Sequence, residues 1–290
     1  MAGTVMHLVI ADRLLDLYEI KNPGYFYCGN LAPDAVMNRE NYVREMKRHT
    51  HFKDGIRLNE FRIPENFAAY MVRLNAFYEA LVAKPSKHWE IYFGYLTHIL
   101  VDELYLLRFR DRFVDMLVAQ GKEPTDLEFF KIFTKDVYLV DLELVRTYRF
   151  HHPMPESLRI HEEYEIPGLV TAKELEDSKE YIIRMNFEAS RKEDDSPKCE
   201  VETADAGRQA QTVQAGFAGG QTGDDAASHQ GEDMTDPEVL KRFYFPDVTG
   251  TYAGDLKVMT LEQNLDFIEL CVREIPRILR DRYGIAPKKE

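Results

Sequence analysis

The pattern of apolar and polar positions along the chain predicts a protein built from helices. Apolar residues recur every three or four positions, which places them on one face of a helix. In the first segment, for example, Leu8, Ala11, Leu14 and Leu15 share a face. The helices predicted in this way cover residues 7–20, 65–83, 87–119, about 125–148, 172–189, 236–245 and 260–283. We therefore expect an all-α fold.

The longest predicted helix, over residues 87–119, is apolar on most sides between Trp89 and Leu107. A helix that is apolar nearly all round is buried in the core. We expect it to be the long central helix of the domain. Segment 21–36, in contrast, carries Pro and Gly at several positions and is predicted to be a loop with an ordered turn.

Composition changes sharply after residue 189. Residues 190–235 are dominated by Gly, Ala, Gln, Ser and Asp and nearly lack branched aliphatic side chains. Such a segment cannot bury enough apolar surface to offset the entropy lost on ordering, so we predict a disordered acidic insertion. Helical patterning resumes over residues 236–290, and we expect these helices to pack back on the domain formed by residues 1–189.

Net charge and cysteine content narrow the classes of function. The 290 residues carry a formal net charge of −13. An acidic field repels phosphate backbones, so long nucleic acids are not expected partners. Three scattered cysteines form neither a disulfide framework nor a zinc knuckle, which indicates a reducing compartment. With no apolar stretch of ~20 residues and no basic leader, we expect a cytoplasmic protein without a transmembrane segment.

The candidate chemistry begins with His98 and Asp102 in YLTHILVDELY, within the most apolar helix. Residues four apart lie on the same helix face, one turn from each other. Burying an imidazole and a carboxylate costs several kcal/mol unless each has strong partners. A divalent metal ion such as zinc, which accepts both ligand types, is one solution. A hydrogen bond between the two side chains across the turn is the other.

Three further fragments contain residue types that bind metals. His7 lies on an apolar helix face, Asp34 lies in GNLAPDAV, and His49 and His51 lie in RHTHFKDG. Taken singly, each has an ordinary explanation: a core or capping histidine, an aspartate that caps a turn, and histidines on an exposed loop. The order of the fragments along the chain is more specific than any one of them.

This order resembles the zinc-dependent phospholipase C family, which is related to the single-strand-specific zinc nucleases. The resemblance covers roughly the first 150 residues and depends on the combination of the Gly-x-x-Ala-Pro-Asp and Tyr-Leu-Thr-His-x-x-x-Asp motifs. It implies a mostly helical fold with a metal cluster at the bottom of a cleft. It also implies one metal ion bound by four residues and a second ion shared by a bridging Asp102 and His7. The four ligands of the first ion are Asp34, His51, His98 and Asp102.

The resemblance also assigns roles within the site. Asp34 is the expected catalytic residue, a ligand that doubles as a proton acceptor. His51 is preferred to His49 because the family's histidine precedes a bulky apolar residue, here Phe52. We expect His49 to be a solvated neighbour. Lys47, Arg48 and Lys53 could counter a substrate's charge, but ordinary solvated positions are favoured for them.

The sequence departs from the family downstream. Secreted family members have two further histidines and a glutamate there, whereas no histidine occurs between Glu103 and Tyr148. Asp136 and Asp141 lie in this stretch and could support the site, bind a second ion or face solvent on their helix. We therefore expect one zinc ion and leave a second ion open.

The leading functional prediction is a metal-dependent phosphoric-ester hydrolase of phospholipase C type that uses a metal-bound hydroxide. Its expected substrate is a small phosphoester or a lipid headgroup. Two alternatives stay open. One is a nucleotide or nucleic-acid phosphodiesterase on the same site, and the other is a non-catalytic relative that binds metal.

Overall fold

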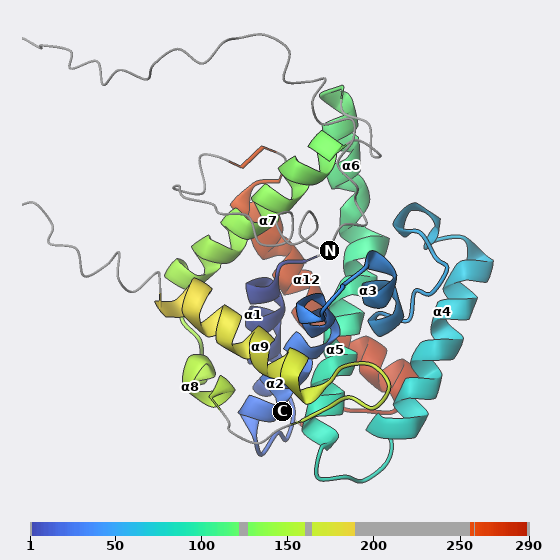
Figure 1. Cartoon of the computed structure of the whole chain (residues 1–290), viewed down its shortest axis with the longest axis vertical. Coiled ribbons are helices and arrows are strands. Elements are labelled where there is room, and N and C mark those ends of the chain that lie inside the picture. Colours follow the sequence, from blue (N-terminus) through green and yellow to red (C-terminus); the bar gives the residue numbers. More distant parts are fainter. Residues whose placement is uncertain (1, 122–126, 160–163, 189–255, 258, 289–290) are drawn as a thin grey trace, which may run out of the picture.

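Helices make up nearly all of the regular structure. The computed structural model describes residues 2–121, 127–159, 164–188, 256–257 and 259–288 (Figure 1). Apart from one isolated bridge between Ile166 and Val170, the described residues form no β-strand, which confirms the all-α class. The α-helices are α1 (Thr4–Leu15), α2 (Pro23–Ala35), α3 (Arg44–Thr50), α4 (Pro64–Phe77), α5 (Trp89–Leu104), α6 (Arg110–Ala119), α7 (Leu127–Thr147), α8 (Met154–Leu158), α9 (Ala172–Ile182) and α12 (Leu261–Tyr283).

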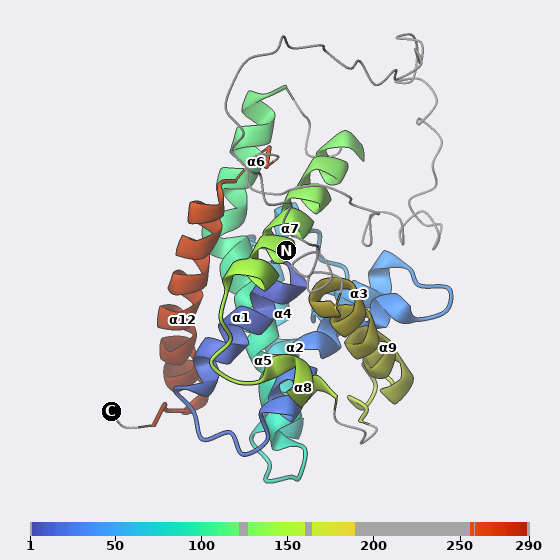
Figure 2. The same ribbon diagram turned by 90° about the vertical axis from the view of Figure 1, so that its left-hand side faces the viewer.

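Helix α5 lies in the middle of the molecule (Figures 1 and 2). Every one of its residues after Trp89 is buried, because neighbouring helices cover it on all sides. It continues through a π-helical turn, η4 (Tyr105–Phe109), into α6, so the segment predicted as one long helix is continuous but changes its winding. Helix α4 likewise ends in a π-helical turn, η3 (Tyr78–Val82), within the predicted range.

The prediction of a loop over residues 21–36 is wrong, because these residues form α2. Pro23 stands in the first turn, where its missing N–H is not needed. The glycine that suggested a loop is instead a packing residue: a Cβ added to Gly29 would lie 2.1 Å from the carbonyl oxygen of Ile91 and 2.9 Å from the Cα of Gly94. Two glycines thus let α2 and α5 approach closely, and this places the end of α2 beside His98.

Helix α12, from the far end of the chain, runs along α1 and α5 on one side of the molecule (Figure 2). Thr260 and Gln263 form a reciprocal capping box at its start. Near its end, Arg282 donates to both carboxylate oxygens of the buried Glu103 at 2.6 and 2.8 Å. The helix predicted over 260–283 is therefore confirmed and packs on the helical core.

Some predictions concern residues outside the described ranges. These are the disordered insertion over 190–235, the helix over 236–245, and Thr125 as a helix cap. Among the described helices, none is long and apolar enough to span a membrane.

Candidate metal centre

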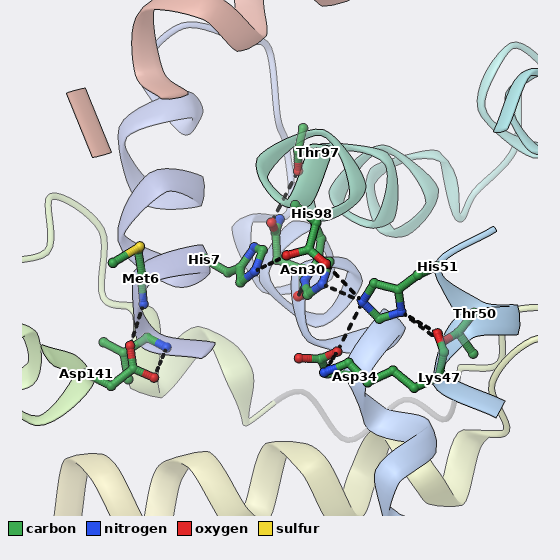
Figure 3. Close-up of polar contacts among 12 residues, drawn as sticks. Met6, His7, Asn30, Asp34, Lys47, Thr50, His51, Thr97, His98 and Asp141 are labelled. Atoms are coloured by element: carbon green, nitrogen blue, oxygen red, sulfur yellow. Dashed lines mark hydrogen bonds and ion pairs between the residues drawn. The ribbon is translucent and has the colours of Figure 1, made fainter. Parts of the chain in front are cut away.

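Four helices bring the five predicted metal ligands together in the interior. His7 lies in α1, Asp34 lies in the last turn of α2, and His51 directly follows the end of α3. His98 and Asp102 both lie in α5. Both aspartates and all three imidazoles lie next to one another (Figure 3 shows all but Asp102 by label). Except for Asp34, whose side chain is 12% exposed, all are fully buried.

The Nε2 atom of His51 is the centre of this cluster. It lies 3.2 Å from Oδ1 of Asp34, 3.4 Å from Oδ2 of Asp102 and 3.4 Å from Nε2 of His98. Ligands that surround zinc tetrahedrally at about 2.0–2.1 Å lie roughly 3.3–3.4 Å from one another. Each of the three distances from His51 is therefore one that two ligands of the same zinc ion can have.

The tautomers of His51 and His98 follow from their outer contacts. Nδ1 of His98 lies 2.7 Å from the carbonyl oxygen of Asn30, and Nδ1 of His51 lies 2.8 Å from that of Lys47. A carbonyl only accepts, so both Nδ1 atoms carry the proton. Both rings are neutral, so each Nε2 atom carries a lone pair, and the two lone pairs face each other. They repel each other unless a cation lies between them. Backbone carbonyls orient metal-binding histidines in this way.

His7 has a different environment. Its ring stacks on that of His98, with centroids 3.8 Å apart, and its Nε2 lies 3.6 Å from Oδ1 of Asp102. Neither ring nitrogen of His7 makes a hydrogen bond, and neither does Oδ1 of Asp102. Buried polar atoms without partners are costly, so these atoms also fit a cation.

The cluster contains two groups whose ligand atoms all lie within 4.8 Å of one another. One is His7, His98 and Asp102, and the other is Asp34, His51 and His98. Both include His98, whose Nδ1 is engaged by Asn30. Since one imidazole nitrogen binds one metal ion, the two groups cannot both be complete at the same time.

The charge states of the ligands are those that a metal requires. Burial lowers the pKa of His51, and burial together with the neighbouring His7 holds the pKa of His98 well below its ordinary value, so both rings are neutral at pH 7. Burial alone would raise the pKa of Asp34, but Lys47 and His51 outweigh it and hold this pKa well below the usual range. Lys53 and His7 likewise outweigh burial at Asp102 and hold its pKa well below the usual range.

The two lysines near the site are buried, so the prediction that they are solvated is wrong. Nζ of Lys47 lies 2.7 Å from Oδ1 of Asp34, and Nζ of Lys53 lies 3.4 Å from Oδ2 of Asp102. Each ammonium offsets one carboxylate charge in an interior of low dielectric constant. Arg48 does remain partly exposed, beside Glu45.

A tight turn after α3 explains why Lys53 enters the site. The N–H of Lys53 donates to the carbonyl of Arg48 at 2.8 Å, and the N–H of Phe52 donates to that of His49 at 3.0 Å. This is the Schellman arrangement that usually has Gly in the left-handed position, but here Phe52 occupies it with φ 59°. The absence of Gly concealed the turn in the sequence.

A pocket with a cavity volume of about 160 Å³ opens beside the cluster. Asp34 and His51 line it, whereas His7, His98 and Asp102 do not. Of the two groups, the one formed by Asp34, His51 and His98 therefore borders this pocket, through Asp34 and His51.

The remaining candidates lie around the site without joining it. Asp136 and Asp141 are buried, so the alternative that they face solvent is wrong. Asp136 accepts from the N–H of Lys257, and Asp141 accepts from those of Val5 and Met6 at 3.0 and 3.1 Å. His49 is a solvated neighbour, with a side chain that is 55% exposed and bound to Asp54.

Comparison of the chain with protein-family models, with curated proteins and with solved structures found no match.

Proposed function

We propose that this protein is a metal-dependent phosphoric-ester hydrolase with a zinc ion bound by Asp34, His51 and His98. The observation that supports this most directly is the pair of neutral imidazoles, whose unprotonated Nε2 atoms face each other at 3.4 Å beside two carboxylates. The donor set of two nitrogens and one carboxylate oxygen is typical of catalytic zinc, which keeps a further position open.

The number of ions follows from the shared ligand. Once His98 binds the ion next to Asp34 and His51, only His7 and Asp102 remain for a second ion, one ligand short of the three usual at a catalytic site. We therefore propose one ion per chain. Asp102 is then a neighbour that His51 and Lys53 contact at 3.4 Å, and the fourth position of the ion would stay open.

When bound, the ion would polarise a phosphoryl oxygen and make a bound water more acidic. Asp34 lines the pocket, so it is a ligand carboxylate that an attacking water molecule could reach. Its pairing with Lys47 lowers its basicity, so we assign ligation as its first role and proton acceptance as its second. Lys53 also lines the pocket and would bind a substrate oxygen.

Hydrolysis of bis(p-nitrophenyl) phosphate by the zinc-loaded, full-length protein tests this proposal. We expect activity that a chelator removes and zinc restores. Asp34→Asn should lower kcat by about 100-fold or more, because it affects both ligation and proton transfer. Phosphatidylcholine and nucleotide diesters should then be tried, to separate the phospholipase from the nucleotide phosphodiesterase.

A non-catalytic metal-binding protein is the second candidate, and the buried lysines favour it. Lys47 and Lys53 already balance the charges of Asp34 and Asp102. A site whose carboxylate charges are balanced in this way can be part of the folded structure without catalysing a reaction. Zinc-loaded protein that is inert on every phosphoester would establish this alternative.

A further inference from the structure

Thr50, the last residue of α3, is buried beside the metal centre. Its hydroxyl oxygen Oγ1 lies 2.8 Å from the carbonyl oxygen of Pro33, 3.0 Å from that of Lys47 and 3.1 Å from Nδ1 of His51 (Figure 3). A hydroxyl has one proton to donate, so only one of the two carbonyls can receive it at a time.

The carbonyl oxygen of Lys47 already has two donors, both from His51. It accepts from the backbone N–H of His51 at 3.1 Å and from Nδ1–H of the same residue at 2.8 Å. These two bonds use both lone pairs of the carbonyl oxygen. The Thr50 hydroxyl therefore donates to Pro33, which also has the nearer of the two carbonyls. Its oxygen can then accept from Nδ1–H of His51 at 3.1 Å.

This hydrogen bond joins α3 to the helix that carries Asp34. Pro33 directly precedes Asp34 near the end of α2. A helical threonine usually donates to a carbonyl in the preceding turn of its own helix, whereas Thr50 donates to another helix. The hydroxyl thus connects the backbone next to one proposed zinc ligand, Asp34, with the imidazole of another, His51.

The backbone of Thr50 makes a third connection, to α5. The hydroxyl of the buried Tyr95 donates to the carbonyl oxygen of Thr50. Burial and, to a lesser extent, the charge of Asp34 hold the pKa of Tyr95 well above its ordinary value, so this hydroxyl stays a donor at neutral pH. Tyr95 lies three residues before His98, on the same face of α5. Thr50 is therefore linked to the elements that carry all three proposed ligands.

We propose that Thr50 is a positioning residue that sets the geometry of the zinc ligands Asp34, His51 and His98, an inference that rests on the zinc site of the proposed function. Residues that hold metal ligands in place commonly contribute about 10- to 100-fold to metal affinity. His51 keeps its hydrogen bond to Lys47 when the Thr50 hydroxyl is lost. The expected effect is therefore a shift of His51 relative to Asp34, with no ligand removed.

Calorimetric titration of zinc into the metal-stripped, full-length protein tests this inference with Thr50→Val, which keeps the shape of the side chain and removes its hydroxyl. We expect zinc affinity to fall by about tenfold to 100-fold, with the stoichiometry of the wild type. Thr50→Ser, which keeps the hydroxyl, should restore most of the affinity. Thr147→Val is the matched control and should leave affinity unchanged. The Thr147 hydroxyl donates to the carbonyl oxygen of Glu143 at 2.7 Å, within α7, a helix that carries none of the proposed ligands.

Cobalt(II) in place of zinc gives a readout that a merely structural role of Thr50 would not change. The visible absorption of cobalt(II) is strong in a tetrahedral site and weak in a six-coordinate one. We expect weaker absorption per bound cobalt ion in Thr50→Val and recovery in Thr50→Ser. If Thr50→Val does not fold, Tyr95→Phe, which removes the link between Thr50 and α5, is judged by the same two measurements.

The outcomes separate this inference from the proposed function. If the wild type binds zinc and Thr50→Val has the same affinity and cobalt spectrum, the positioning role is overturned and the zinc site stands. Equal losses in Thr50→Val and Thr50→Ser also overturn it, because the hydroxyl is then not the cause. If the wild type binds no zinc, the zinc site and this inference fail together. Zinc-loaded wild type that is inert on phosphoesters removes only the hydrolase.

Discussion

At the scale of single residues, the sequence indicated which side chains lie together in the cluster, but not which groups orient them. His51 and His98 could be singled out because an apolar context makes a polar side chain costly. Their anchors could not, because Asn30 and Lys47 contribute backbone carbonyls, which every residue possesses. Phe52 concealed the turn that buries Lys53, since a left-handed residue is normally expected to be Gly.

The choice between His49 and His51 as the metal ligand gives a prediction at the scale of single residues. His51→Ala should lower zinc affinity by about 100-fold or more, because it removes a ligand at the centre of the cluster. His49→Ala should change zinc affinity less than about twofold, since the His49 side chain is exposed and contacts Asp54. Calorimetric titration of zinc into the two purified variants checks this. Equal affinities in the two variants would remove His51 from the ligand set.

At the scale of elements, most of the longer helices were predictable, whereas α2, α3 and α8 were not predicted. The amphipathic patterns of α4 and α12 and the apolar run of α5 are strong, and the prediction of these helices was confirmed. Helix α2 was missed because Gly29 and Pro33 read as loop signals, although Gly29 serves close packing against α5. A tertiary contact of this kind leaves no periodic trace in the sequence. The hydrogen bonds that Asp141 of α7 accepts from α1 could not be predicted from the sequence either.

Asp141 accepts from the first N–H groups of α1, the helix that carries His7 (Figure 3). Burial raises its pKa to about 7, against the backbone hydrogen bonds, which favour the carboxylate. The folded protein therefore binds this proton more tightly than the unfolded chain does. Its contribution to stability is fully present below about pH 4 and is lost as the pH rises to about 7, at up to about 1.4 kcal/mol per pH unit.

Asp141→Asn should remove this pH dependence. The free energy of unfolding of the wild type, minus that of the variant, should fall between pH 4.5 and pH 7.5. Urea denaturation at several pH values measures both proteins under the same conditions. A difference that stays constant, or that rises with pH, would show that Asp141 keeps an ordinary or lowered pKa in the folded protein.

At the scale of the whole molecule, α12 closes the helical core next to the metal centre. Its Arg282 pairs with Glu103, the residue that follows the predicted ligand Asp102. A second ion pair, between Arg13 of α1 and Glu269 of α12, lies at the surface. The sequence indicated that 260–283 packs back on the core, but it gave no means of telling which charged residues would be buried.

The two ion pairs should differ in their effect on stability. Arg282→Met leaves the buried Glu103 without its arginine partner, although the Tyr70 hydroxyl still donates to it at 3.1 Å, so we expect the free energy of unfolding to fall by about 3–5 kcal/mol. Glu103→Leu combined with Arg282→Met should recover much of this loss, because an apolar pair replaces the charges. Arg13→Met, the surface control, should cost less than about 1 kcal/mol. Similar losses in Arg282→Met and Arg13→Met in urea denaturation would contradict this ranking.

The central claim is that the buried cluster binds one divalent ion. The most direct measurement is calorimetric titration of zinc into the metal-stripped, full-length protein, with its melting temperature recorded at each ratio. We predict one equivalent per chain, a melting temperature that rises with bound zinc, and loss of both effects in His98→Ala. Failure of zinc to bind, with no change in melting temperature, would contradict the account.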